Sequence, residues 1–137
     1  MPTFAIALLL LAANPQAPVR ATVESIHDGD TLRLTIHLPF GVDLPARDVR
    51  AAGYDAWEID RRRRTVKVTD AEIAKGKEAR EYLSQLLAVG GCWVEDTGQR
   101  DPYGRLSVSL WGRNKNGGDW IDVAEEMRDA GYDRRVK

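Results

Sequence analysis

Residues 19–38 read VRATVESIHDGDTLRLTIHL, and this stretch predicts the first two strands of the fold. Apolar and polar residues alternate in its first eight positions and again over residues 31–38. Alternation with a period of two is typical of strands that bury one face. Between the two runs stands Asp28-Gly29, a pair that favours a tight turn. The stretch therefore predicts an antiparallel hairpin.

The rest of the chain predicts three more strands and two helices. The expected strands cover residues 48–53, 92–95 and 106–110. Thr69 and Glu72 match a capping box, so a helix is expected to begin there and to end at Gly90-Gly91. A second helix is expected over residues 121–130. Three strands, a helix, two strands and a helix describe an α+β, mostly β chain: a five-stranded OB-fold barrel with two helices.

Length and composition fit one domain. The chain has 137 residues, of which 43% are hydrophobic and 30% charged, as expected for a globular core. The net charge of −1 gives no attraction of the whole molecule to nucleic acid, so such binding would need a local basic patch. The chain is expected to be a monomer.

The first 17 residues differ from the rest. Residues 4–13 are apolar, too short to span a bilayer and suited to the core of a signal peptide, although no basic residue precedes them. We therefore expect a signal peptide over residues 1–17, a domain over residues 18–137 and a secreted or periplasmic protein. The alternative is an apolar element of the fold itself.

Three polar clusters carry the chemistry of the sequence. They are Asp28-Gly29-Asp30-Thr31, Arg50-x4-Asp55-x2-Glu58 and Asp101-x-Tyr103-Gly104-Arg105. Asp30 and Asp55 are placed at strand ends that can converge in a barrel. Carboxylates with a backbone carbonyl and no cysteine or histidine favour Ca²⁺ or Mg²⁺ over zinc.

The two arginines and the glutamate suit phosphodiester chemistry. Arg50 and Arg105 can each grip two phosphoryl oxygens, and fixed cations there stabilise the charge that develops when water attacks. No histidine lies in the clusters, so a carboxylate, Glu58, is the candidate for orienting or deprotonating that water. Taken alone, each of these residues is more often a surface residue than part of a site.

Taken together, the clusters resemble the staphylococcal-nuclease-like (thermonuclease) family. The matching residues are Asp28-Gly29-Asp30-Thr31, the Arg50, Asp55 and Glu58 spacing, and Gly98-Gln99-Arg100-Asp101-Pro102-Tyr103-Gly104-Arg105. The resemblance runs from about Val19 to Tyr132. It implies an OB-fold and a secreted, calcium-dependent nuclease that hydrolyses DNA and RNA and leaves 3′-phosphate ends.

The resemblance also implies a role for each matching residue. The metal ligands would be Asp30, Asp55 and the carbonyl of Ala56, with Asp28 behind them. The catalytic residues would be Arg50, Glu58 and Arg105. Tyr103 would contact the nucleotide.

The chain departs from the family between Asp55 and Glu58. Members of the family usually have proline before the glutamate, whereas this chain has Trp57, which could stack on a base instead. A run of four arginines follows, and it is either a solvated loop or a strip that binds phosphates. The run consists of Arg61, Arg62, Arg63 and Arg64.

Two other functions stay open. The first is an OB-fold module that binds nucleic acid or a protein without cutting it. The second is a small structural or envelope-associated domain anchored by its apolar N-terminus. The presence of Arg50, Glu58 and Arg105 together with both metal-site aspartates favours the nuclease.

Overall fold

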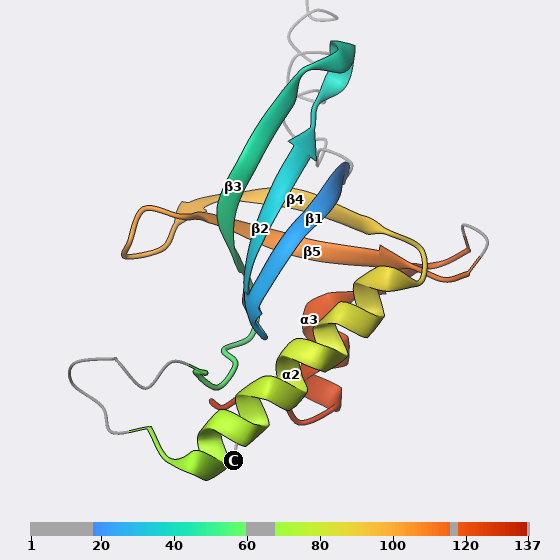
Figure 1. The fold of residues 1–137 in the computed structure, drawn as a ribbon. Helices are drawn as coiled ribbons and strands as arrows, with labels where there is room; N and C mark the ends of the chain where they lie inside the picture. The colour runs from blue at the N-terminus through green and yellow to red at the C-terminus, as the bar shows by residue number, and fades with distance from the viewer. Residues whose placement is uncertain (1–17, 60–67, 116–117, 137) are drawn as a thin grey trace, which may run out of the picture.

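The computed structural model describes residues 18–59, 68–115 and 118–136. Within these ranges the chain is α+β and mostly β, as predicted, with an OB-like closed barrel of five strands, one further strand and two helices (Figure 1). The predicted signal peptide at residues 1–17 and the arginines at 61–64 lie outside the described residues.

The barrel contains the predicted hairpin, and the other strands extend the sheet from its two edges. The strands are β1 (Val19–Asp28), β2 (Thr31–His37), β3 (Asp43–Ala51), β4 (Cys92–Arg100), β5 (Leu106–Arg113) and β6 (Trp120–Asp122). The sheet order is β3-β2-β1-β4-β5-β6, and β3 also pairs with β5 in parallel. That last pairing, which sets Val49 opposite Leu106, closes the barrel.

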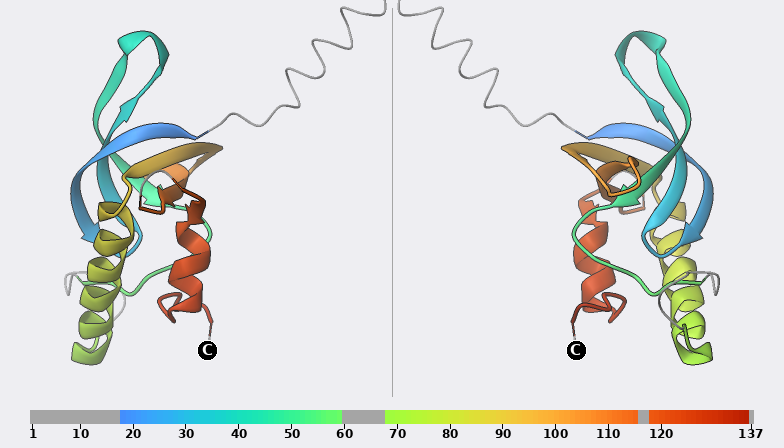
Figure 2. Two further views of the ribbon diagram at one scale, coloured as in Figure 1. Left: turned by 90° about the vertical axis from the view of Figure 1, so that its right-hand side faces the viewer. Right: turned by 90° about the vertical axis from the view of Figure 1, so that its left-hand side faces the viewer.

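Both helices pack at one end of the barrel. Helix α2 (Asp70–Ala88) begins at the predicted cap, where the Thr69 side chain accepts a hydrogen bond from the Glu72 N–H at 3.2 Å. Helix α3 (Val123–Asp129) is capped by Asp122, whose side chain accepts from the Ala124 N–H at 3.1 Å. Figure 2 shows the two helices side by side below the strands.

Several strand boundaries were predicted wrongly. Residues 96–102 were expected to be a loop, but β4 continues to Arg100, which pairs with Leu106 of β5. Strand β3 begins at Asp43 rather than at residue 48, and the short strand β6 was not expected. These segments are polar or short, so they have no apolar pattern that would reveal a strand. They are strands because they pair with a neighbouring strand.

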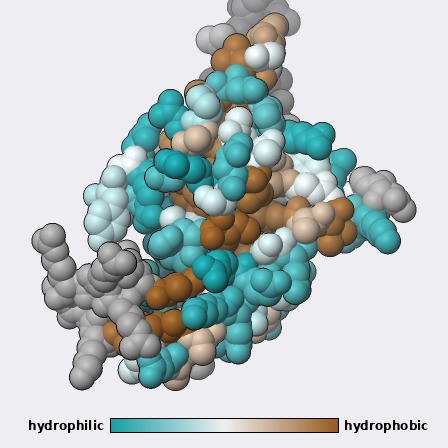
Figure 3. Space-filling model, in the orientation of Figure 1, coloured by the Kyte–Doolittle hydropathy of each residue, from teal (hydrophilic) through white to brown (hydrophobic). Residues whose placement is uncertain are grey.

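The core lies inside the barrel and under the helices. Its largest fully buried side chains come from β2, β3, β5, α2 and α3. They are Leu32, Leu34, Leu83, Met127, Val49, Val108 and Val123. Hydrophilic residues cover most of the face in Figure 3, and hydrophobic ones appear there in separate places. Among the described residues, no helix is long and apolar enough to cross a membrane.

Candidate functional site

The β1–β2 turn buries two carboxyl groups at the helix end of the barrel. Asp28 and Asp30 are each only 3% exposed, and the Asp28 side chain accepts a hydrogen bond from the Asp30 N–H at 3.0 Å. Between them, a Cβ on Gly29 would lie 2.7 Å from that of Ala56 and 2.8 Å from that of Ala79. The turn needs glycine because the chain following β3 and helix α2 both approach it closely.

Arg50 joins the first two predicted clusters. It projects from β3, and its Nη2 lies 3.1 Å from Asp30 Oδ2 and 2.9 Å from Asp55 Oδ1. Asp30 Oδ2 also accepts a hydrogen bond from the Ala56 N–H at 2.9 Å. One guanidinium nitrogen therefore bridges the two aspartates that the sequence predicts as metal ligands, so both carboxylates face the same space.

Burial favours the protonated, uncharged form of the Asp30 carboxyl group. It raises the pKa of Asp30 to about 8, and the hydrogen bond and negative charge of Asp28 act in the same direction. The positive charge of Arg50 and the Ala56 N–H oppose this rise but do not cancel it. A positive charge beyond that of Arg50 would therefore stabilise this pair of buried carboxyl groups in their ionised state.

The donor set is chemically suited to a hard cation. Asp28, Asp30 and Asp55 offer only oxygen, which is the ligand that Ca²⁺ and Mg²⁺ prefer. Among the residues that the structure describes, no three or more histidine, cysteine, aspartate or glutamate side chains form a group with metal-binding geometry. The fit therefore rests on the chemistry of the set and on the convergence of Asp30 and Asp55 at Arg50.

Arg105 approaches the same end of the barrel from the β4–β5 turn. Asp101 shapes this turn by accepting hydrogen bonds from the backbone N–H groups of Tyr103 at 2.9 Å and Arg105 at 2.8 Å. It also forms an ion pair with the Arg105 guanidinium. From there, Arg105 Nη1 donates to Thr31 Oγ1 at 3.4 Å, beside Asp30. The second predicted phosphate clamp thus reaches Thr31, the residue that follows Asp30.

The electrostatics of Asp101 follow from this turn. Burial raises the pKa of the Asp101 carboxyl, but the hydrogen bonds and charge of Arg105 outweigh that effect and leave the pKa below its usual range. Asp101 is therefore an ionised partner that fixes the orientation of Arg105. The predicted nucleotide contact, Tyr103, is 73% exposed on the same turn, and the Arg105 guanidinium lies 5.6 Å from the centre of its ring.

Glu58 is positioned by close contact with helix α2. A Cβ on Gly76 of that helix would lie 2.8 Å from the carbonyl oxygen of Trp57 and 3.1 Å from that of Glu58. The Trp57 ring lies against the same helix, with the Lys75 ammonium 5.7 Å from its centre. The segment that carries Glu58 can lie along α2 because residue 76 has no side chain.

The residues after α3 contribute contacts that the sequence did not indicate. Arg134 Nε pairs with Asp55 Oδ2 at 2.7 Å, and the Arg134 N–H donates to the Asp55 carbonyl at 2.8 Å. The Asp55 N–H donates to Asp133 at 3.3 Å, and Arg135 donates to the Gly53 carbonyl at 2.9 Å. The segment 133–135 is thus bonded to the segment 53–55, which carries a predicted metal ligand.

Charge also links this segment to the site. The Arg135 side chain is the main reason that the pKa of Asp133, which is 3% exposed, lies below its usual range. The pKa of Arg134 is raised, first by its hydrogen bond to Asp55 and further by the charges of Asp55 and Glu58. In the sequence the segment 133–135 resembles a charged surface tail. Its role becomes visible only in the structure, where Asp133 is buried and Arg134 pairs with Asp55.

Tyr54 is a second residue that sequence reasoning missed. Its side chain is 2% exposed, and its hydroxyl donates to the Gly29 carbonyl at 2.5 Å. Burial, followed by the charges of Asp30 and Asp28, raises its pKa well above the usual range, so the hydroxyl stays a neutral donor. Tyr54 therefore ties the segment after β3 to the turn between the two buried aspartates.

The predicted residues fall into three groups. Asp28, Asp30, Arg50, Asp55 and Ala56 form one hydrogen-bonded cluster, and Arg105 reaches it through Thr31. Glu58, Trp57 and Tyr103 lie on the two segments beside it, and the arginines at 61–64 lie outside the described residues. No model of a known protein family matches this chain, and the search of curated proteins found no match either.

Proposed function

We propose that this protein is a cation-dependent phosphodiester hydrolase: a secreted, calcium-dependent nuclease that acts on DNA and RNA and leaves 3′-phosphate ends. One observation carries the proposal. Arg50 lies between Asp30 and Asp55 while Arg105 reaches the neighbouring Thr31, so acidic groups suited to a cation and two guanidinium groups suited to a phosphate share one end of the barrel.

The two arginines are held in different ways. Arg50 uses a single nitrogen, Nη2, for both of its ion pairs. Because a guanidinium carries five N–H donors, its other N–H groups can reach phosphoryl oxygens. Arg105 is oriented by the ionised Asp101. Both would bind the oxygens on which negative charge accumulates as water attacks, and so stabilise the transition state.

The cation would be held by Asp30, Asp55 and the carbonyl of Ala56, with Asp28 behind them. Calcium, or magnesium in its place, would supply positive charge that lowers the pKa of a water molecule and stabilises the charge on the phosphate. Glu58 would accept a proton from the attacking water or orient it. Its place along α2 is fixed by the close approach at Gly76.

A binding module that does not cut is the second candidate. It is favoured by the way the acidic groups are already satisfied: Asp30 and Asp55 both pair with Arg50, and Asp55 also pairs with Arg134. A site whose carboxylates are neutralised by the chain itself has less need of a cation. In that case Arg50 would stabilise the fold by pairing with the two aspartates, and Arg105 would bind phosphate without catalysis.

Cleavage of denatured DNA by the purified protein in millimolar Ca²⁺ tests the proposal. We expect cleavage that stops in EDTA and in Glu58→Ala but persists in Glu125→Ala, which removes an exposed carboxylate from α3. Intact DNA in every reaction, from protein shown to be folded, would favour the binding module. Cleavage by Glu58→Ala at the wild-type rate would contradict the role of Glu58.

A further inference from the structure

Two hollows flank β3 beside Arg105. One has a volume of about 440 Å³ and is lined by Arg47 and Arg100 among other residues. The other has a volume of about 410 Å³ and is lined by Arg33. Asp48 and Arg105 line both. The two hollows therefore meet at the arginine that we propose as a phosphate clamp.

The charge of these hollows is opposite to that of the chain. Four arginines and one aspartate line them, which gives +3, or +2 when the Asp101 that pairs with Arg105 is also counted, whereas the whole chain carries −1. The aspartate is Asp48, and it is paired with Arg33 at 3.1 Å. Arg47 is exposed and forms no ion pair with any described residue. The lining is thus a local cationic patch, which an acidic protein needs to attract a polyanion.

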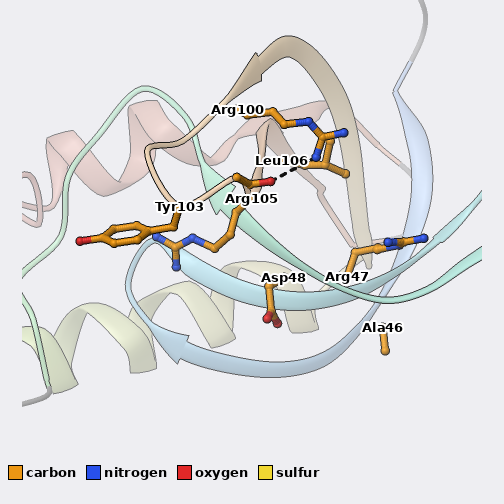
Figure 4. Close-up of a pocket in the computed structure, with 8 residues that line it drawn as sticks. Ala46, Arg47, Asp48, Arg100, Tyr103, Arg105 and Leu106 are labelled. Carbon is orange, nitrogen blue, oxygen red and sulfur yellow. Dashed lines mark hydrogen bonds between the residues drawn. The ribbon is translucent and has the colours of Figure 1, made fainter.

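An aromatic ring lies at one end of the patch. Figure 4 shows Tyr103 and Arg105 to the left of Asp48 and Arg47 to its right, with Arg100 above them. The side chain of Arg100 also donates to the Gly104 carbonyl at 3.2 Å, which ties it to the turn that carries Tyr103. A basic groove with an exposed aromatic ring is the combination that binds single strands, because phosphates meet the cations and an unpaired base can stack.

We propose that the two hollows form one groove for single-stranded nucleic acid, the arginine groove, in which Arg33, Arg47 and Arg100 bind phosphates beyond the one held at Arg105. The choice of ligand rests on the proposed function, but binding in the groove requires no cleavage. A duplex offers no unpaired base to Tyr103, so the groove selects single strands. The arginine groove meets the cluster around Asp30 and Asp55 at Arg105 and Thr31.

Binding of a fluorescent oligothymidine to the full protein in EDTA, measured by anisotropy over a series of salt concentrations, tests the groove. Each phosphate contact on a single strand contributes about 0.7 to the slope of log affinity against log salt. We expect Arg47→Ser/Arg100→Ser to lower that slope by about 1.4 and the affinity about tenfold near 0.15 M salt. Lys77→Ser/Lys115→Ser, which removes two exposed cations elsewhere, is the control and keeps the wild-type slope.

A gain of affinity tests the same groove in the other direction. Asp48→Asn removes its one acidic group and frees Arg33. The exposed ion pair that is lost contributes little to stability, so the variant is expected to fold. We expect tighter binding of the single strand and a steeper salt slope. An unchanged slope in both the double variant and Asp48→Asn would overturn the proposal, as would tighter binding of a duplex than of a single strand.

A minimal substrate separates this proposal from the proposed function. A small phosphodiester such as bis(4-nitrophenyl) phosphate does not extend into the arginine groove, so Arg47→Ser should reduce its hydrolysis far less than it reduces cleavage of an oligonucleotide. If the wild-type protein hydrolyses nothing while its oligonucleotide binding follows the predicted slopes, the nuclease fails and the groove stands. If it cuts DNA while the double variant binds and cuts normally, the groove fails and the nuclease stands.

Discussion

Gly76→Ala should lower activity while leaving the free energy of unfolding nearly unchanged. Glycine inside a helix costs about 1 kcal/mol relative to alanine, so helix propensity alone predicts that the variant is more stable. The new Cβ, however, would lie 2.8 Å from the Trp57 carbonyl oxygen and 3.1 Å from that of Glu58. Both partners are backbone atoms, so the segment carrying Glu58 must move.

The size of that movement sets the expected loss. Reaching an ordinary contact of about 3.4 Å requires the Trp57 carbonyl to shift by about 0.6 Å. A misplacement of about 1 Å in an active site can cost on the order of 100-fold in rate. We therefore expect kcat to fall about tenfold, which is about 1.4 kcal/mol of transition-state stabilisation. The free energy of unfolding should change by less than about 1 kcal/mol, because the helix gain offsets the strain.

Single-turnover cleavage of an oligonucleotide, together with urea unfolding, measures both quantities. Lys77→Ala is the matched control, because it changes the next, exposed residue of α2 without approaching the Glu58 segment. We expect that control to keep the wild-type rate. Wild-type turnover in Gly76→Ala would refute the argument that close packing on α2 positions Glu58. A large loss of stability would instead assign residue 76 to the fold.

Three further changes affect the arginine clamp, the C-terminal contacts and the buried acid. Arg105→Lys keeps the charge but loses the planar fork that pairs with Asp101, so kcat should fall at least about tenfold in a folded protein; turnover close to wild type would contradict the clamp. Asp133→Ala leaves the Asp55 N–H without its acceptor and the Arg135 side chain without its ion-pair partner, and it should cost about 1–3 kcal/mol in urea unfolding, whereas the exposed Asp129→Ala should cost almost nothing. In EDTA, folded Asp30 keeps its proton up to about pH 8, whereas the unfolded chain loses it near its ordinary value of 3.8. The folded state therefore binds more protons between these values, and the free energy of unfolding should fall as the pH rises from about 4 to about 8. Asp30→Asn should remove that part of the slope, and an identical slope in both proteins would show that another group is responsible.

Elements with local causes were predictable from the sequence. The alternation around Asp28-Gly29 specified the first hairpin, and the Thr69 side chain caps α2 as expected. The continuation of β4 to Arg100 was not predictable, because residues 96–100 are polar and exposed and have no apolar alternation. Their strand geometry depends on pairing with β5, a tertiary contact that the local pattern does not encode.

Part of the candidate site was likewise predictable from the sequence, and part of it was not. Residue type and spacing made Asp30, Arg50 and Asp55 candidates for one site, and the structure brings the three side chains together. Arg134 pairs with Asp55 across 79 residues, and no motif links the two. In the sequence Gly76 is only one residue of the predicted helix, because the need for a residue without a side chain appears only when a second segment packs against it.

The proposed activity requires that this end of the barrel direct water at a phosphodiester. Mass spectrometry of a defined single-stranded oligonucleotide, incubated with the protein and Ca²⁺ in H₂¹⁸O, tests it most directly. We predict fragments that end in a 3′-phosphate carrying one ¹⁸O atom from the wild-type protein, and intact oligonucleotide from Glu58→Gln. Intact oligonucleotide from folded wild-type protein, or fragments that Glu58→Gln produces equally fast, would contradict the account.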